Sequence, residues 1–396
     1  MSGRGHILGL AAAVLLAGCS GEGVTRTDQG AIERRWSDGQ LPRYGGPRPG
    51  ATNTAPLKVG LLLPLTGRYA AYGQSLLNAA ALALFDAPSE RAVDLLPRDT
   101  GGTPEGAAAA AVDAAAAGAG VLIGPALEAS AAAAQRSVGA SGAPLLMLSG
   151  DRRLAASGAF VAGHAPAALA TQIVDFAYRR GVRVIAGLGP DTRAASEALL
   201  GMQAAAQARG MTIVSTGVLR GPMAEPELHA AIAQVLQAIG PDGALFLPFP
   251  AESLPPIARS IQAVSGGRSP ILLGLADWDS IGLATLPSFG RAFFAGPDPA
   301  QTAAFRRRYA AFFGSAPPRD AALVYDLVAT AQVAGSAAPG RGLSAYALEA
   351  PGGFVGVEGP FRLTREGAAR RAYSIVGIVG GRLQAIEPAS AGLLAN

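Results

Sequence analysis

The sequence predicts an α/β protein built from two doubly wound, mostly parallel sheets, because three features of the chain agree. Short, nearly continuous apolar runs recur along it, as expected for strands that are buried on both faces of a sheet. Longer segments with a helical pattern alternate regularly with these runs. There are too many such units for one sheet, and 396 residues are enough for two lobes of ordinary size.

The predicted strands begin where a polar, Gly- and Pro-rich stretch gives way to Lys58-Val-Gly-Leu-Leu-Leu-Pro64. Further strands of the same character are predicted over residues 93–97, 120–124, 144–148, 183–188, 211–218, 243–247 and 271–275. Sheets of this kind bind ligands at the carboxyl ends of their strands. We therefore expect a ligand site in the cleft between the two lobes.

Helices are predicted between these strands. The segment over residues 104–117 is rich in alanine, the residue with the highest helix propensity. The full set of predicted helices covers residues 75–85, 104–117, 130–139, 166–180, 194–209, 227–238 and 254–264.

The N-terminal residues predict an exported lipoprotein. After the positive Arg4, the apolar run over residues 7–16 suits the core of a signal peptide and is too short to span a bilayer. It ends in Leu16-Ala17-Gly18-Cys19, which resembles the bacterial lipobox, so we predict a leader over residues 1–18 and a lipid on Cys19. Ser20 then implies sorting to the outer membrane. The alternative is an ordinary secretory leader that happens to contain a cysteine.

Residues 19–56 are predicted to form the lipidated end and a flexible tether. They are polar and rich in Gly, Pro, Thr, Arg and Asp, with almost no branched apolar residues. The tether would hold the folded part away from the membrane. The alternative is a partner-binding segment, for which Ile32, Trp36, Leu41 and Tyr44 are candidate apolar anchors.

Composition excludes several classes of function. The net charge is +4, but the basic residues are scattered apart from short groups such as Arg306-Arg307-Arg308, so nucleic-acid binding is not expected. The single cysteine allows no internal disulfide and no thiolate metal site, and His164 and His229 lack metal-ligand spacing. No dinucleotide fingerprint, Walker loop or nucleophile elbow is present. We therefore expect no cofactor, no metal and no enzymatic activity.

The order of motifs resembles that of type I periplasmic binding proteins, the leucine/isoleucine/valine-binding group. Residues 58–67 with Tyr72-Gly73, then the phrase from Asp99 to Ala107 and Val121-Leu-Ile-Gly124, resemble that family, as does the stretch over residues 302–326. The resemblance covers about residues 57–388. It implies that the chain crosses between the lobes three times through a three-strand hinge. Lobe one would then comprise residues 57–163 and 281–345, and lobe two residues 164–280 and 346–388.

Within that family the chain looks most like the lipoproteins known as penicillin-binding protein activators. The phrases Leu96–Gly106 and Gly359–Gly367 are in their style. This resemblance implies a periplasmic, outer-membrane-anchored regulator of peptidoglycan synthesis whose partner is a peptidoglycan synthase. The best-known activators carry a long helical-repeat half before this domain, where the present chain has only its tether.

The resemblance also implies candidate ligand-binding residues. Relatives hold an amino acid's carboxylate with hydroxyls and amides of lobe one and its ammonium with an acid of lobe two, because a desolvated zwitterion needs donors and an anion. The positions that match are Tyr72 as an aromatic wall, Glu128 and Ser130 at a serine donor, Ser149 to Arg153 at a hydroxyl loop, and Glu252 near the ammonium-binding acid.

Several of these positions depart from the amino-acid pattern. Asp151, Arg152 and Arg153 replace small and hydroxyl residues, although an arginine could bind a carboxylate bidentately. Asp277 and Trp278 follow the predicted strand over 271–275, and Trp278 could stack on a ligand or pack the cleft. Two functions stay open, the activator described above and a transporter's solute-binding protein for an amino acid or related amide.

Overall fold

A computed structural model gives the fold and describes residues 55–86, 91–139, 142–221, 224–280, 282–337 and 343–390. The chain divides into two units, Met1–Pro42 and Arg43–Asn396, and every described residue belongs to the second. The predicted leader over 1–18, the predicted lipid on Cys19 and nearly all of the predicted tether lie outside the described residues. Among the residues that are described, no helix has the length and apolar character needed to cross a membrane.

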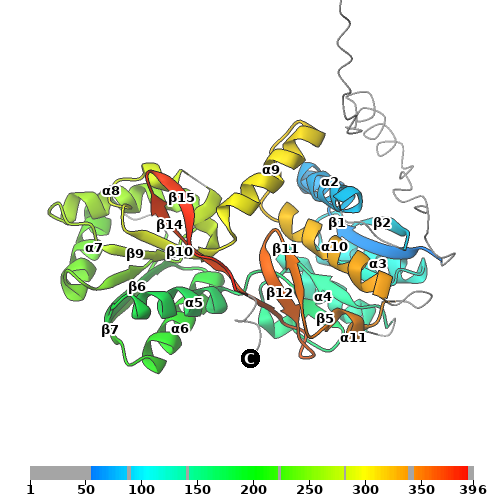
Figure 1. The fold of residues 1–396 in the computed structure, drawn as a ribbon, viewed down its shortest axis with the longest axis horizontal. Helices are drawn as coiled ribbons and strands as arrows, with labels where there is room; N and C mark the ends of the chain where they lie inside the picture. Colours follow the sequence, from blue (N-terminus) through cyan, green and yellow to red (C-terminus); the bar gives the residue numbers. More distant parts are fainter. Residues whose placement is uncertain are drawn as a thin grey trace, which may run out of the picture. The chain divides into compact units, whose positions relative to one another are not determined.

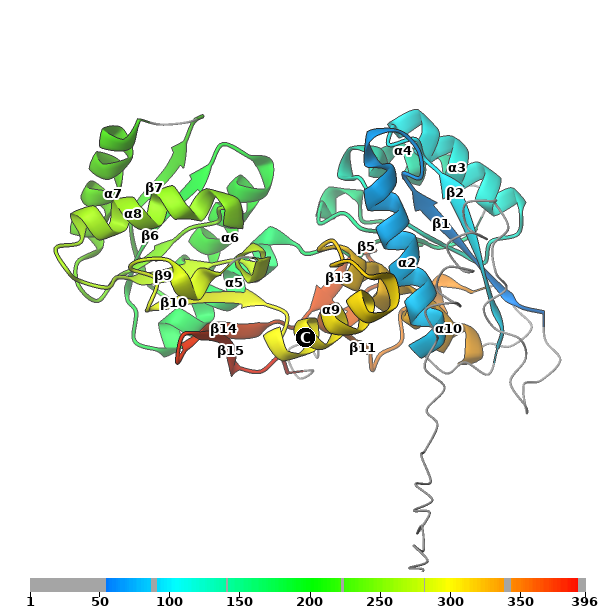
Figure 2. The same cartoon turned by 90° about the horizontal axis from the view of Figure 1, so that it is seen from above.

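The first lobe is built on a five-stranded parallel sheet in the order β2-β1-β3-β4-β5. Its strands are β1 (Leu57–Leu63), β2 (Val93–Asp99), β3 (Val121–Ile123), β4 (Leu145–Met147) and β5 (Ala159–Val161). One face carries α2 (Ala70–Asp86), α9 (Pro299–Phe313) and α10 (Ala321–Ala337), and the other carries α3 (Pro104–Ala116) and α4 (Glu128–Val138) (Figure 2). The sheet is therefore covered on both faces, as its apolar strands require.

Small residues let α3 pack closely on the first sheet. Buried alanines of α3 and α4 form much of the core on this face. The strand beneath has Gly60, where a Cβ would lie 2.5 Å from Leu122 and 3.0 Å from Ala114. The helix begins at the capping residue Thr103, whose hydroxyl accepts a hydrogen bond from the N–H of Gly106.

The second lobe is built on a seven-stranded sheet in the order β15-β14-β10-β9-β8-β6-β7. Its strands are β6 (Val184–Pro190), β7 (Thr212–Leu219), β8 (Ala244–Phe246), β9 (Ile271–Gly274), β10 (Ala292–Gly296), β14 (Ser374–Val379) and β15 (Arg382–Glu387). The strand β14 pairs in antiparallel fashion with both of its neighbours, β10 and β15. One face packs against α5 (Pro166–Arg179) and α6 (Arg193–Ala208), and the other against α7 (Glu225–Ile239) and α8 (Leu254–Val264) (Figure 1).

A small antiparallel sheet completes the first lobe. It consists of β11 (Phe354–Gly356), β12 (Gly359–Leu363) and β13 (Ala369–Arg371). Its inner residues Phe361 and Leu363 are buried in the same core as β1, α2 and α10. The polypeptide that follows α10 therefore packs on the first lobe, although the sequence predicted that residues 346–388 belong to the second.

The connections between the lobes differ from the predicted boundaries in two of three places. The first lies between β5 and α5. The second follows β10, because β10 pairs in parallel with β9 and so extends the second sheet, which moves this crossing from residue 281 to about residue 297. The third lies between β13 and β14, at residues 372–373 rather than at 346. The second crossing shifts because β10 joins the second sheet, and the third shifts because β11, β12 and β13 form a small sheet of their own that packs on the first lobe.

The α/β fold with two doubly wound lobes is confirmed. Every predicted strand has a counterpart within one or two residues at each end, and the predicted helices match α2 to α8. The largest difference is at α2, which begins at Ala70 instead of Ser75.

Candidate functional site

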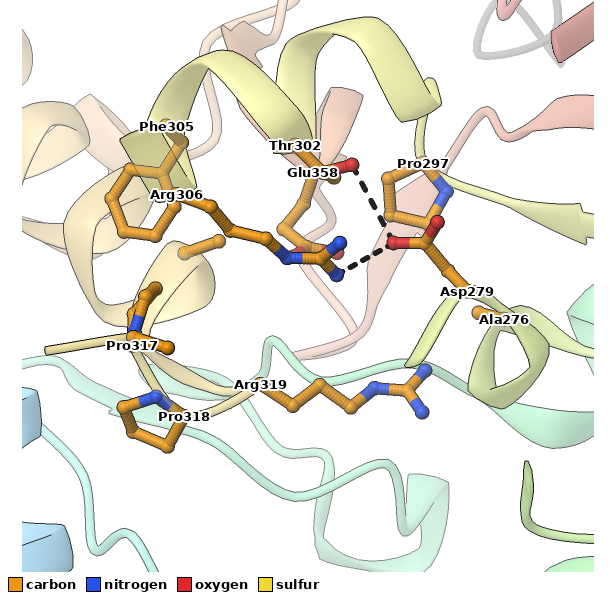
Figure 3. Close-up of a pocket in the computed structure, with 12 residues that line it drawn as sticks. Ala276, Asp279, Pro297, Thr302, Phe305, Arg306, Pro317, Pro318, Arg319 and Glu358 are labelled. Carbon is orange, nitrogen blue, oxygen red and sulfur yellow. Dashed lines mark hydrogen bonds and ion pairs between the residues drawn. The ribbon is translucent and has the colours of Figure 1, made fainter. Parts of the chain in front are cut away.

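A pocket of about 320 Å³ lies where residues of both lobes meet. The second lobe contributes the short helix η4 (Ala276–Ser280), and the first lobe contributes α9 and the loop that precedes α10. Glu358, in the turn between β11 and β12, forms part of the same wall. The side chains that line this pocket are shown in Figure 3.

Two arginines of the first lobe face two aspartates of the second. The Arg306 Nη2 atom lies 2.7 Å from Asp279 Oδ2, and the hydroxyl of Thr302 lies 3.5 Å from the same oxygen (Figure 3). Arg319 forms an ion pair with Asp277 at the rim. Both arginines therefore present guanidinium groups at the pocket while bridging the lobes.

Apart from Glu358, the rest of the lining is apolar. Phe305, Pro317 and Pro318 lie on one side of the pocket in Figure 3, and Ala276 and Pro297 lie on the other. This surface can cover an apolar body, and the guanidinium groups can hold a charged end. The arrangement thus suits a small amphipathic molecule.

Burial shifts the pKa values of charged side chains in this pocket. Burial raises the pKa of Asp279 above its ordinary value even though Arg306 opposes this shift. Burial lowers the pKa of Arg319, whose guanidinium is surrounded by acids that oppose the shift. The arginines remain charged at any physiological pH, whereas the burial of Asp279 disfavours its anion. The pocket thus offers an anionic ligand two guanidinium groups, each of which is also paired with an aspartate.

Glu358 is held from behind by buried polar groups. Its Oε2 atom lies 2.8 Å from His164 Nε2, and its backbone N–H donates to Asp326 at 2.9 Å. Burial alone would raise the pKa of Glu358, but His164, Arg371 and Arg319 together hold it below its ordinary value. Glu358 is thus an ionised carboxylate whose charge is balanced mainly from outside the pocket.

Asp326 gives the protein a testable pH dependence. It is buried on α10, accepts the N–H groups of Val357 and Glu358, and burial raises its pKa to about 7. Because an unfolded aspartate titrates near 3.9, the folded state binds this proton more tightly. The preferential protonation of Asp326 in the folded state stabilises the fold by on the order of 4 kcal/mol. This contribution is fully present below about pH 4 and is lost as the pH rises through about 7.

We expect Asp326→Asn to remove that part of the pH dependence. Urea unfolding at pH 5.5 and pH 8 should show a smaller loss of stability for the variant than for the natural chain over this interval. Parallel profiles for the two proteins would contradict the assignment.

None of the predicted ligand-binding residues lines this pocket, but three of them lie close to one of its arginines. Asp277 reaches it through Arg319, and Glu252, exposed on η3 (Ala251–Ser253), acts electrostatically on the same arginine. The Tyr72 hydroxyl donates to Asp320 Oδ2 at 2.6 Å, so Tyr72 contacts the residue next to Arg319. These three predicted positions lie around Arg319.

The hydroxyl loop forms a separate cluster. The Ser149 hydroxyl accepts the N–H of Asp151, and the Asp151 carboxylate binds Arg153 and, at 2.7 Å, Arg193 of α6. Asp151 is buried, and its two oxygens are occupied by these guanidinium groups. The loop therefore joins the lobes through an ion pair, and none of its residues lines the pocket.

The remaining three predicted residues also lie outside the pocket lining. Glu128 is exposed at the start of α4, and Ser130 is buried in the same helix with no hydrogen-bond partner for its hydroxyl among the described residues. Trp278 was a candidate ligand contact, but it is fully buried and packs on Phe289 and Phe294. Of the two alternatives for Trp278, the structure supports packing.

Sequence reasoning missed Arg306, Arg319, Asp279 and Glu358. Arg306 belongs to an arginine triplet in which Arg308 binds Asp86 and Arg307 is exposed, so composition does not single it out. The one available signal was the Asp277-Trp-Asp279 motif at the end of a buried strand, where a second carboxylate follows the first.

Two sheet-based lobes that are connected three times, with a charged pocket where their residues meet, have the architecture of type I periplasmic binding proteins. A family model described as periplasmic binding protein matches residues 56–382. The chain therefore belongs to the periplasmic binding protein family. No curated protein matches it significantly.

Solved structures have the same fold. A structure of a branched-chain amino acid ABC transporter protein from Rhodospirillum rubrum is 22% identical, with a TM-score of 0.72, and the match covers 84% of this chain and 100% of that one. A solute-binding protein from R. palustris in complex with benzoate is 20% identical over 85% and 98%, with a TM-score of 0.61. A substrate-binding protein from Desulfitobacterium hafniense in complex with Leu is 18% identical over 83% and 99%, with a TM-score of 0.60.

Proposed function

We propose that this chain is a non-enzymatic solute-binding protein of a transporter and that its ligand is a small organic carboxylate. The observation that carries the proposal is the pair Arg306 and Arg319 beside an apolar wall in one pocket. Planar guanidinium groups suit a carboxylate, and Phe305 with the neighbouring prolines suits an apolar or aromatic body. Family membership supports a periplasmic location.

The relatives support this class of function over the activator role that the sequence predicted. The similar structures are transporter proteins, one in complex with benzoate and another in complex with Leu. The phrase Leu96–Gly106, which suggested an activator, is also needed by the fold itself. Asp99 accepts the N–H groups of Leu65, Thr66 and Gly101, and Thr103 caps α3. Outer-membrane anchoring through Cys19 and a peptidoglycan-synthase partner stay predictions from the sequence.

The test is calorimetric titration of the full chain with benzoate, leucine and benzamide. We expect benzoate to bind and benzamide, which has the same ring without the charge, to bind at least tenfold more weakly. Leucine tests whether an ammonium group is tolerated beside Asp279. Equal affinity for benzoate and benzamide, or no heat with any of the three, would contradict the proposal.

Variants assign the site. Arg319→Gln and Arg306→Gln should each weaken benzoate binding by about tenfold or more, because each removes a charged donor. The matched control is Arg307→Gln, which changes an exposed arginine of the same helix that does not line the pocket. Circular dichroism should show that all three variants are folded. A loss of affinity as large in Arg307→Gln would place the ligand elsewhere.

A further inference from the structure

A histidine joins two of the connections between the lobes to the wall of the pocket. His164 lies on the first connection, and its Nδ1 atom is 2.9 Å from the hydroxyl of Tyr373, which lies on the third. Its Nε2 atom is 2.8 Å from Glu358, which lines the pocket. His164 itself does not line the pocket. The imidazole thus touches the pocket only through a carboxylate.

The surroundings of His164 contain several other charged and titratable groups. Glu358 and Tyr373 contact its ring, and Arg371 and Arg319 act electrostatically on both of these partners. Asp326 holds the backbone of Glu358. On the side of the second lobe, the neutral Gln172 of α5 binds the carbonyl of Arg371 and the N–H of Tyr373.

The contacts of His164 suit both of its protonation states. Burial raises the pKa of Tyr373, so its hydroxyl keeps its proton and can either donate to Nδ1 or accept from it. Nε2 carries a hydrogen toward Glu358 in both states. Protonation of His164 therefore changes the charge beside Glu358 without breaking a hydrogen bond.

We propose that a proton on His164 strengthens the binding of an anion in the pocket. With His164 protonated, the charge of Glu358 is compensated from behind, and Arg306 and Arg319 dominate the pocket. With His164 neutral, the carboxylate of Glu358 is less compensated, and it repels the ligand's anion. This inference rests on the proposed function, because it concerns the affinity of the same pocket for a carboxylate.

The sign and size of the effect follow from linkage. The affinity for an anion should rise by about fivefold or more from pH 8 to pH 5.5. Benzoate stays ionised over this range, so its own protonation does not contribute. Asp326 and Asp279 also have raised pKa values, so the contribution of His164 must be isolated by substitution.

The experiment measures benzoate affinity by calorimetry at pH 5.5, 6.5 and 8 in the full chain, in His164→Gln and in His229→Gln. Glutamine can still donate to Glu358 and accept from Tyr373, but it cannot become charged. His164→Gln should keep its pH 8 affinity and lose most of the gain at pH 5.5. His229, paired with Glu225 on α7, is the matched control and should leave the full pH dependence.

The outcomes separate the two proposals. Benzoate binding with no pH dependence, or with one that persists in His164→Gln, would overturn the role of His164 and leave the solute-binding function standing. An equal loss of pH dependence in His229→Gln would also overturn it. If benzoate does not bind at any pH, the same titrations are made with leucine, and the absence of binding with both ligands would overturn both proposals.

Discussion

Replacing Trp278 with alanine is expected to lower the free energy of unfolding by about 3–5 kcal/mol. The indole has no exposed surface and packs on Phe289 and Phe294, with ring centroids 5.4 and 6.4 Å away. Gly274 leaves room for it, since a Cβ there would lie 2.2 Å from the ring. Removing the indole would leave a cavity between η4 and the second sheet, and urea unfolding followed by circular dichroism measures the loss.

A second substitution distinguishes packing from ligand contact at this position. Trp278→Phe keeps an aromatic ring in the core and should cost less than half as much stability as the alanine variant. Its benzoate affinity should match that of the natural chain, because the indole does not line the pocket. A folded Trp278→Phe protein that no longer binds any ligand would contradict the packing assignment.

The fold could be predicted because its determinants are local. A run such as Lys58–Pro64 is apolar at nearly every position. This pattern is typical of a strand that is buried on both faces of a sheet, as β1 is. The lobe boundaries could not be predicted in the same way. Ala292–Gly296 lies between β9 and β14 in the second sheet, whereas Gly359–Leu363 belongs to a small separate sheet packed on the first lobe, and both placements are properties of the assembled fold.

The site was harder to predict because its contacts join distant positions. The sequence resemblance identified Tyr72, Asp151 and Glu252 by their place along the chain. It could not show that the Tyr72 hydroxyl is bound to Asp320 or that the Asp151 carboxylate is bound to Arg193. The pocket arginines could not be identified for the same reason, because the sequence does not show which arginines line a pocket and which form ion pairs elsewhere on the surface. Of the predicted positions, Tyr72, Glu252 and Asp277 lie around Arg319, and none of them lines the pocket.

Replacing Arg371 with methionine is expected to destabilise the chain by about 3–5 kcal/mol at pH 8. Arg371 is buried at the end of β13, with its guanidinium 4.6 Å from the ring of Phe361. Its charge lowers the pKa values of Asp326 and Glu358, which are buried nearby. Methionine fills a similar volume, so the main effect of the change is to leave two buried carboxylates without this cation.

The loss in Arg371→Met should depend on pH in a defined direction. Without the cation, the folded-state pKa values of Asp326 and Glu358 rise, so the folded variant gains stability when these groups bind protons. The difference from the natural chain should therefore be largest at pH 8 and shrink toward pH 5 in urea unfolding experiments. Arg370→Met is the matched control, because Arg370 is exposed on the same strand and should change stability by less than about 0.5 kcal/mol. If Arg371→Met were as stable as Arg370→Met at pH 8, the buried carboxylates would have to be neutral or compensated by other groups, and the charge balance described for the pocket would be wrong.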